Sequence, residues 1–533
     1  MKKTIFFLTG ILAGTTMMAQ SIDDAKQLMY YERFGTATTT LHNVLKNDPA
    51  NAEAWYWLAE SYLQRDENKP IEDSLAAAPA DAWNEPIFQV AYGHLLLENN
   101  KKDSAHYYFE KALDQTRGRN VAVLAAVARA AIDAPDGDLS YAIEQINKAI
   151  KRDKKNASLY ILLGNAYRKQ NNGTEAYKAY QTALDKDASN AEALYQMGKI
   201  FVTQKNSDVY LDYFQKAIAA DPSYAPAYYE LYNHYVNREP AKAMDYFKKY
   251  TSLADYEAHN EYAYTDLLFL NKQYNEAILG AQKLLQQDEK VPRLYKLMAY
   301  SYAGIKDTAA AISSMQHYFA QEEDSNLIVW DYDAMAQWYA TQTGGEDSAI
   351  AYYQKAVQHE KDTTAQTVYY KKLATLSSSL KDYSSAAKWL GNYYKGNPKT
   401  TNVDLFNWGV AHFRAEEYPQ ADSVFGMYVQ RYPEQGFGYY WQARSNALID
   451  STMELGLAVP HYQKLIDVIE KDTTTSETNN TWLIQAFNYL AAYEANIKKD
   501  YPAAIIYFNK ILAIDPANEQ AYKNISILEK NSK

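Results

Sequence analysis

The chain contains no cysteine. That absence excludes disulfides, thiolate metal ligands, a nucleophilic thiol and a lipid anchor on a cysteine at a processed N-terminus. The chain has 533 residues, more than one compact core usually holds, so we expect several domains or a solenoid. Because disulfides are excluded, the fold must be stabilised by packing alone.

An excess of basic charge is also missing. There are 54 Lys and Arg against 65 Asp and Glu, which gives a net charge of −11 and a pI of about 5.4. Proteins contact nucleic-acid phosphates mainly through Lys and Arg, so we predict no nucleic-acid partner. The acidity is typical of a solvated, self-repelling surface.

Long hydrophobic runs are lacking, apart from a short one near the N-terminus. Lys2 and Lys3 precede the apolar segment Ile5–Gly14, and small or neutral residues follow as far as Ala19. This pattern predicts a secretory signal that is cut after Ala19. The apolar segment is too short to span a membrane. We therefore expect an exported protein, periplasmic or secreted, with no membrane span.

No catalytic motif is present. The sequence has no glycine-rich phosphate loop, no nucleophile elbow and no metalloprotease helix. The nine His residues are scattered and never lie four positions apart, which disfavours a zinc site. We predict a protein that is not an enzyme and that carries no cofactor and no metal.

What the sequence does have is a register that returns every 34 residues, clearest in Ala157–Asn190 and Ala191–Tyr224. When the two segments are aligned, small residues fall on small ones and large apolar residues on large ones: Tyr160 on Leu194, Leu163 on Met197, Gly164 on Gly198, Tyr167 on Phe201, Tyr180 on Phe214 and Ala183 on Ala217. A period of this length predicts a stack of helical hairpins. Gly164 and Ala176 are expected to face each other across one hairpin, so that its helices approach closely.

The pattern resembles the tetratricopeptide repeat (TPR) family. The residues that carry the resemblance are Tyr160, Leu163, Gly164, Tyr167, Ala176, Tyr180 and Ala183, with counterparts from Trp55 to Pro516. The resemblance implies an all-α fold, a right-handed superhelical solenoid of antiparallel helix pairs. We expect a signal peptide at 1–19, about fourteen hairpins in one continuous solenoid at 20–516, and a capping helix and tail at 517–533. A polar linker is expected at Asp472–Asn480.

Tyr is the most unusual component, with 50 residues against 16 Phe. Most Tyr residues occupy the large core sites of the repeat, where we expect packing. A second set, Tyr195, Tyr229 and Tyr262, recurs one residue after a core site. One step along a helix is a rotation of about 100°, so these rings leave the hairpin seam.

In TPR proteins this face of the first helix lines the concave groove that takes ligands. One turn further along, the same face carries polar and aromatic residues: Asn165, Lys199, Asn233, Asp266 and Tyr300. Together with the three rings they form a candidate ladder for an extended peptide or a glycan. The alternative is that these rings only pack between neighbouring first helices.

We therefore predict a non-enzymatic scaffold of the cell envelope that binds a protein or peptide on its concave face. The alternative is a glycan-binding protein related in architecture to SusD-like outer-membrane proteins. Those proteins normally carry a lipidated Cys and interrupt their repeats with long insertions, whereas this chain has no Cys and keeps its register.

Overall fold

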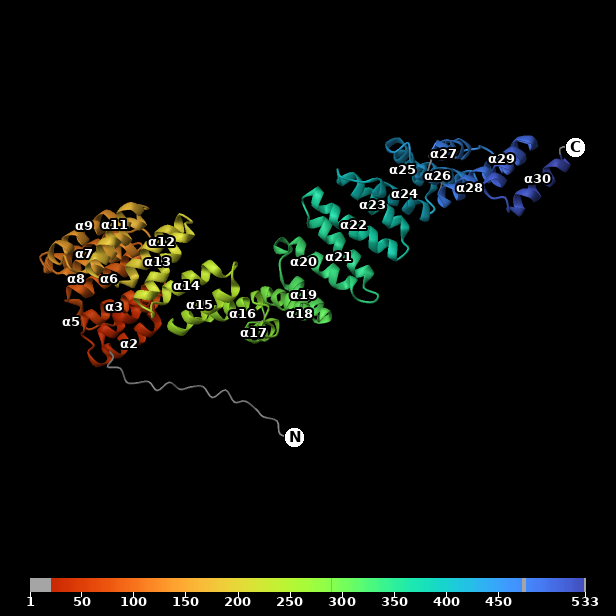
Figure 1. Cartoon of the computed structure of the whole chain (residues 1–533). Helices are drawn as coiled ribbons and strands as arrows, with labels where there is room; N and C mark the ends of the chain where they lie inside the picture. Colours follow the sequence, from red (N-terminus) through yellow and green to blue (C-terminus); the bar gives the residue numbers. More distant parts are fainter. Residues whose placement is uncertain (1–20, 289, 472–475, 532–533) are drawn as a thin grey trace, which may run out of the picture. The chain divides into compact units, whose positions relative to one another are not determined.

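The computed structural model describes residues 21–288, 290–471 and 476–531, and over these residues its secondary structure is entirely helical (Figure 1). The helices are arranged in antiparallel pairs, so the predicted fold class is confirmed. The chain divides into two compact units, which meet between Glu289 and Lys290. Each unit is described by itself below. The predicted signal at 1–19 lies outside the described residues.

Over residues 21–288 the first unit contains seventeen α-helices, and most of them are 9 to 14 residues long. They are α1 (Ile22–Tyr30), α2 (Phe34–Asn47), α3 (Ala52–Leu63), α4 (Asn68–Ala76), α5 (Ala80–Trp83), α6 (Pro86–Glu98), α7 (Lys102–Gln115), α8 (Val121–Asp133), α9 (Leu139–Arg152), α10 (Ala157–Lys169), α11 (Gly173–Lys186), α12 (Ala191–Thr203), α13 (Ser207–Ala220), α14 (Ala225–Tyr235), α15 (Pro240–Leu253), α16 (Ala258–Leu270) and α17 (Tyr274–Gln287).

The second unit continues the pairing. Its helices are α18 (Pro292–Gly304), α19 (Thr308–Gln321), the 3-10 turn η1 (Asp324–Asn326), α20 (Val329–Ala340), α21 (Glu346–His359), α22 (Thr363–Ser379), α23 (Tyr383–Gly396), α24 (Asn402–Arg414), α25 (Tyr418–Arg431), α26 (Gly436–Ile449), α27 (Val459–Lys471), α28 (Glu477–Tyr493), the π-turn η2 (Glu494–Lys498), α29 (Tyr501–Ile514) and α30 (Glu519–Asn531). Residues 477–480 of the expected polar linker Asp472–Asn480 belong to α28 instead, and the Ser476 side chain caps this helix by accepting the Asn479 N–H at 3.0 Å. Residues 472–475 lie outside the described residues.

Most hairpins turn through one residue in the left-handed backbone region. Asn171 (φ 59°) and Lys205 (φ 56°) occupy this place after α10 and α12. After α10, the N–H of Asn172 donates to the carbonyl of Tyr167 at 2.9 Å, which satisfies a group left over at the helix end. The same turn recurs along the chain and sets the tight return of each second helix.

In four hairpins the seam is closed by a large ring of the second helix that lies on a glycine of the first: Phe109 on Gly93, Tyr180 on Gly164, Phe214 on Gly198 and Phe425 on Gly409. A Cβ added to Gly198 would lie 2.6 Å from the Phe214 ring, and one added to Gly164 would overlap the Tyr180 ring. Gly164 is therefore covered by Tyr180, and not by Ala176 as the sequence suggested. Tyr180 and Phe214 are completely buried.

Among the described residues, no helix combines the length and apolar character needed to cross a membrane. Within the same residues, no group of three or more potential ligands is placed to hold a metal ion.

We predict that Gly164→Ala and Gly198→Ala each lower the free energy of unfolding by about 1–3 kcal/mol, because the new Cβ overlaps a fully buried ring that cannot move aside. Urea unfolding followed by circular dichroism measures this loss. Gly173→Ala is the matched control, since its Cβ would meet only Ile200, at an ordinary 3.6 Å. Equal stability of all three variants would contradict this account of the seam.

Candidate functional site

The predicted ladder begins at Tyr195 on α12, and this ring is packed. Only 9% of Tyr195 is exposed. Its ring centroid lies 5.7 Å from that of Phe214 and 5.6 Å from that of Tyr224. Tyr195 therefore packs on the second helix of its own hairpin, α13, and on Tyr224, the residue that precedes α14.

The polar members beside it also have partners within the chain. Lys199 forms an ion pair with Glu230 on the next first helix, α14. The Asn165 side-chain oxygen accepts a hydrogen bond from the Tyr180 hydroxyl at 2.7 Å. The Lys199–Glu230 pair links the first helices α12 and α14, and the Tyr180–Asn165 hydrogen bond links α11 to α10 within one hairpin.

The ladder opens to solvent farther along, on α14 and α16. Tyr229 is 36% exposed, with its ring 5.0 Å from that of Tyr250, and Asn233 is exposed. Tyr262 and Asp266 on α16 are half-buried. Tyr229 and Asn233 are therefore the most exposed members of the predicted ladder in the first unit. Asn165 and Lys199, like Tyr262 and Asp266, are half-buried.

Tyr300 belongs to the second unit and is held there by a buried carboxylate. Its hydroxyl donates to Asp331 at 3.1 Å, and Lys296 pairs with the same carboxylate at 2.8 Å. Asp331 is completely buried. A similar pair joins Lys372 to Asp333 at 2.6 Å. Sequence reasoning missed these pairs, although Lys and Asp about one repeat apart on first helices were a usable signal.

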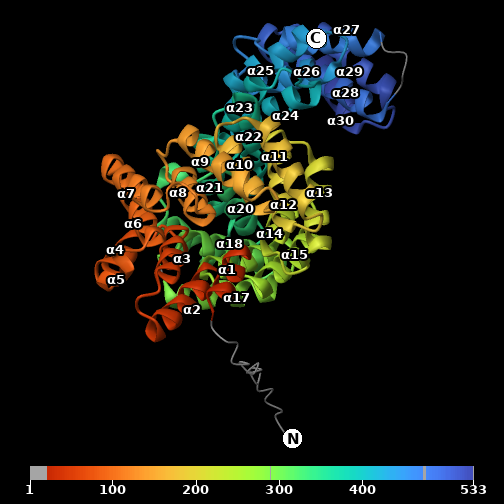
Figure 2. The ribbon, with the colours of Figure 1, turned by 90° about the vertical axis from the view of Figure 1, so that its left-hand side faces the viewer.

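The concave side of the first unit is partly covered by its own first hairpin. The Tyr30 ring lies 5.2 Å from the Tyr224 ring. Asp255, in the turn after α15, accepts the Thr36 N–H at 2.9 Å and the Arg33 guanidinium N–H at 3.2 Å. No side chain within the first hairpin caps α2, so Asp255 supplies that cap from 219 residues away in the chain. Figure 2 shows α1 and α2 beside α14 and α15.

Beneath this hairpin lies a polar chamber of about 340 Å³. Its charged lining residues are Lys26, Glu32, Glu60, Arg129, Asp133 and Glu192. Glu60 is 1% exposed and accepts a hydrogen bond from His94 at 2.8 Å. The Arg129 guanidinium lies over the Trp57 ring, 5.1 Å from its centroid.

The carboxylates of the chamber are crowded, although Glu32 and Asp133 each keep an exposed side. Burial, helped by the Glu192 carboxylate, raises the pKa of Glu32 to about 7. Burial and the Glu60 carboxylate raise the pKa of Asp133 to about 6. Both side chains retain solvent contact inside the chamber while protein surrounds them on most sides. Glu32 and Asp133 can therefore bind protons at a pH near neutral. No sequence motif indicated this chamber.

A larger cleft, of about 770 Å³, lies between α15, α16 and α17. Phe247, Thr265 and Leu268 form apolar parts of its wall, and Tyr256 and Leu279 stand largely exposed at 76% and 65%. The Glu261 carboxylate links two side chains at the mouth of the cleft. It accepts hydrogen bonds from Tyr256 at 2.9 Å and from Lys283 at 2.8 Å. This volume falls within the roughly 300–1,000 Å³ typical of ligand pockets.

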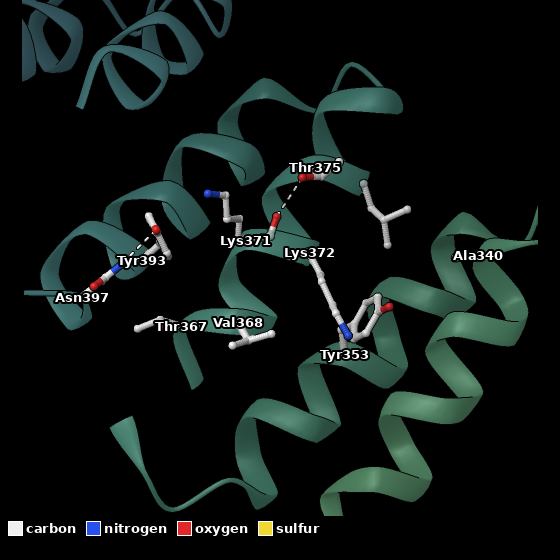
Figure 3. A pocket seen from close by; sticks show the side chains of 10 residues that line it. Ala340, Tyr353, Thr367, Val368, Lys371, Lys372, Thr375, Tyr393 and Asn397 are labelled. Atoms are coloured by element: carbon white, nitrogen blue, oxygen red, sulfur yellow. Dashed lines mark hydrogen bonds between the residues drawn. The ribbon is translucent and has the colours of Figure 1, made fainter. Parts of the chain in front are cut away.

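The second unit has an open hollow of about 580 Å³ between α20, α21, α22 and α23 (Figure 3). The Lys372 ammonium lies 4.9 Å from the Tyr353 ring centroid, and Lys371 lies 5.1 Å from that of Tyr393. Asn397 donates to the Tyr393 hydroxyl at 2.8 Å. Because Lys372 also pairs with Asp333, its charge is already neutralised within the chain.

Comparison with known proteins supports the repeat assignment. Models of the TPR repeat match residues 164–205, and models of the tetratricopeptide repeat match 24–70 and 191–224. No curated protein shows significant similarity to the chain.

Several solved structures share the repeat. The C-terminal part of a TPR repeat-containing protein from Cytophaga hutchinsonii is 28% identical, with 50% of this chain and 99% of that one covered and a TM-score of 0.31. YrrB, a TPR protein with an unusual peptide-binding site, is 23% identical over 34% and 94% of the two chains, with a TM-score of 0.31. A tetratricopeptide repeat protein from Parabacteroides merdae is 19% identical over 48% and 98%, with a TM-score of 0.29.

The raised pKa of Glu32 predicts a pH-dependent stability. Between its usual pKa of 4.5 and about 7, the folded chain binds more protons here than the unfolded chain, so this group's contribution to stability falls as pH rises. Glu32→Gln removes the charge. We expect it to raise the melting temperature above that of the wild type at pH 8, and to have little effect at pH 4.

Calorimetric melting at the two pH values measures the difference. Glu416→Gln is the matched control, because Glu416 has the same left-handed backbone (φ 61° against 57° at Glu32) in another hairpin turn. If Glu32→Gln and Glu416→Gln shift the melting temperature alike at pH 8, the chamber does not cause the effect.

Proposed function

We propose that this TPR-repeat protein is a non-enzymatic scaffold of the cell envelope that binds a protein or peptide partner. The cleft between α15, α16 and α17 is the observation that carries the proposal. It combines an apolar wall, a charged mouth and exposed apolar side chains. A peptide offers complementary groups of all three kinds along an extended backbone.

The open end of the predicted ladder extends this binding surface. Tyr229 and Asn233 on α14, and Tyr262 and Asp266 on α16, belong to the same two hairpins that supply the cleft. A partner that enters the cleft can therefore also contact the accessible part of the first-helix face. Packed members such as Tyr195 support the fold and are not part of the proposed contact.

Export to the envelope is part of the proposal, and it rests on the N-terminal sequence. The charged start, the apolar segment Ile5–Gly14 and the small residues up to Ala19 predict cleavage by signal peptidase. We expect N-terminal sequencing of the protein purified from its native cells to begin at Gln20, and cell fractionation to place it outside the cytoplasm. A cytoplasmic protein that begins at Met1 would contradict this part.

Affinity capture tests the binding function. The mature chain is immobilised, exposed to an envelope extract, and its partners are identified by mass spectrometry. We expect Tyr256→Ala combined with Leu279→Ala to reduce recovery of the specific partner at least fivefold, because the two exposed side chains at the cleft lose their apolar contact area.

Tyr107→Ala combined with Ile506→Ala is the matched control, since these side chains are similarly exposed (62% and 60%) and lie far from the cleft in sequence. Equal recovery by both double variants would reject the cleft as the binding surface. Capture of glycans without any protein or peptide would favour the glycan-binding alternative.

A further inference from the structure

The second helix of each hairpin carries a large apolar residue at its eighth position, with one exception. In the described part of the chain these residues are Leu41, Leu75, Phe109, Ile146, Tyr180, Phe214, Phe247, Met315, Tyr353, Leu390, Phe425, Ile466 and Phe508. In α17 the eighth residue is Ala281, and the seventh is Gly280. The two preceding second helices have adjacent rings at these places, Tyr213-Phe214 in α13 and Tyr246-Phe247 in α15.

The seventh-position rings have a defined role in those two hairpins. Tyr213 stacks on Phe201, with centroids 5.8 Å apart and planes at 4°. Tyr246 stacks on Tyr235, also at 5.8 Å and with planes at 17°. Phe201 and Tyr235 each lie on the last turns of the first helix of the same hairpin.

In the α16–α17 hairpin the corresponding first-helix residue is Leu268, and no ring from α17 covers it. Gly280 instead faces Thr265, whose Oγ1 would lie 2.8 Å from a Cβ added at Gly280. Gly280, Thr265 and Leu268 all line the 770 Å³ cleft. The cleft therefore includes the region where a second-helix ring lies in the two preceding hairpins.

We propose that this cleft takes an aromatic side chain of a basic peptide segment, and that the bound ring lies over Leu268 beside Gly280 in place of the missing ring. The inference rests on the proposed peptide-binding function and specifies its ligand. Burying an aromatic side chain is worth about 1.5–3 kcal/mol, which corresponds to a tenfold to hundredfold gain in affinity.

An unpaired acceptor in the wall supports a peptide as the occupant. Asn260 is 8% exposed and lines the cleft. Within the described part of the chain, its side-chain oxygen has no hydrogen-bond donor. A buried acceptor left unpaired is unfavourable, because it has lost its hydrogen bonds to water without gaining another. A backbone N–H of a bound peptide supplies the missing donor once the Asn260 amide turns toward it.

The charges around the cleft select a basic partner. Of the charged residues that line the cleft, Asp255 already pairs with Arg33 and Glu261 with Lys283. That leaves the carboxylates of Glu257 and Glu276 against one cation, Lys248. The whole chain is acidic as well, with a net charge of −11. Lys or Arg residues flanking the aromatic side chain would complement this mouth, and the attraction would weaken with added salt.

The test uses the mature full-length chain and the peptide acetyl-Ser-Lys-Phe-Lys-Ser-amide, with 4-fluorophenylalanine as its central residue. Fluorine NMR line broadening follows its binding, and unlabelled peptides compete for the site. We expect the Phe peptide to bind at least tenfold more tightly than the same peptide with Ala at the centre. We expect replacement of both Lys by Glu to weaken binding by a further factor of about five or more.

Two kinds of variant locate the site. Gly280→Tyr combined with Ala281→Phe restores the ring pair of α15 and should abolish binding if the variant folds, as circular dichroism will show. Glu276→Lys changes only an exposed charge at the mouth, so it leaves the fold intact and should weaken binding threefold to tenfold. Glu175→Lys, at the same third position of α11, is the matched control and should leave binding unchanged.

Equal affinity for the Phe and Ala peptides would overturn the inference, as would equal weakening by Glu276→Lys and Glu175→Lys. If an envelope partner is captured through Tyr256 and Leu279 but the Phe peptide does not bind, this inference fails and the proposed function stands. If the Phe peptide binds in the cleft but no envelope partner is captured, the proposed function is rejected. The inference that the cleft binds an aromatic side chain of a basic peptide then stands.

Discussion

The packing of one large second-helix ring onto one first-helix glycine is the contact on which the most regular hairpins depend. At Gly198 the Phe214 ring occupies the space that a Cβ would need, and Tyr180 does the same at Gly164. Because both rings are completely buried, the distance between the two helices is set by this contact. The next hairpin then stacks on a surface of defined shape, and the array continues.

The same rule explains where the chain departs from regularity. Where the ring pair of the second helix is replaced by Gly280-Ala281, the hairpin seam is closed by Thr265 instead, and a 770 Å³ cleft lies alongside it. The proposed binding surface thus lies where small residues replace large ones in an otherwise repetitive framework. A partner that fills the cleft restores contacts that neighbouring hairpins make within themselves.

The exposed face of the first helices shows which features could be predicted from the sequence and which could not. The register correctly placed Tyr195, Lys199 and Asn165 on successive first helices, but each has a partner inside the chain. Those partners come from the neighbouring hairpin or from the second helix of the same hairpin, and the period alone does not orient side chains across that distance. Asp255, which caps α2 from 219 residues away, has no local signal at all.

The sequence by itself determined that this chain is an array of helical hairpins, because the small and large seam positions recur at a fixed spacing that only one local packing satisfies. The sequence also contains Gly280 and Ala281 at the two positions where the preceding second helices carry adjacent rings. Only the tertiary structure decided which of the regularly spaced residues remain open to a partner. The curvature of the first unit brings its first hairpin onto the turn after α15 and encloses the Glu32 chamber, and that approach depends on the sum of many small packing angles.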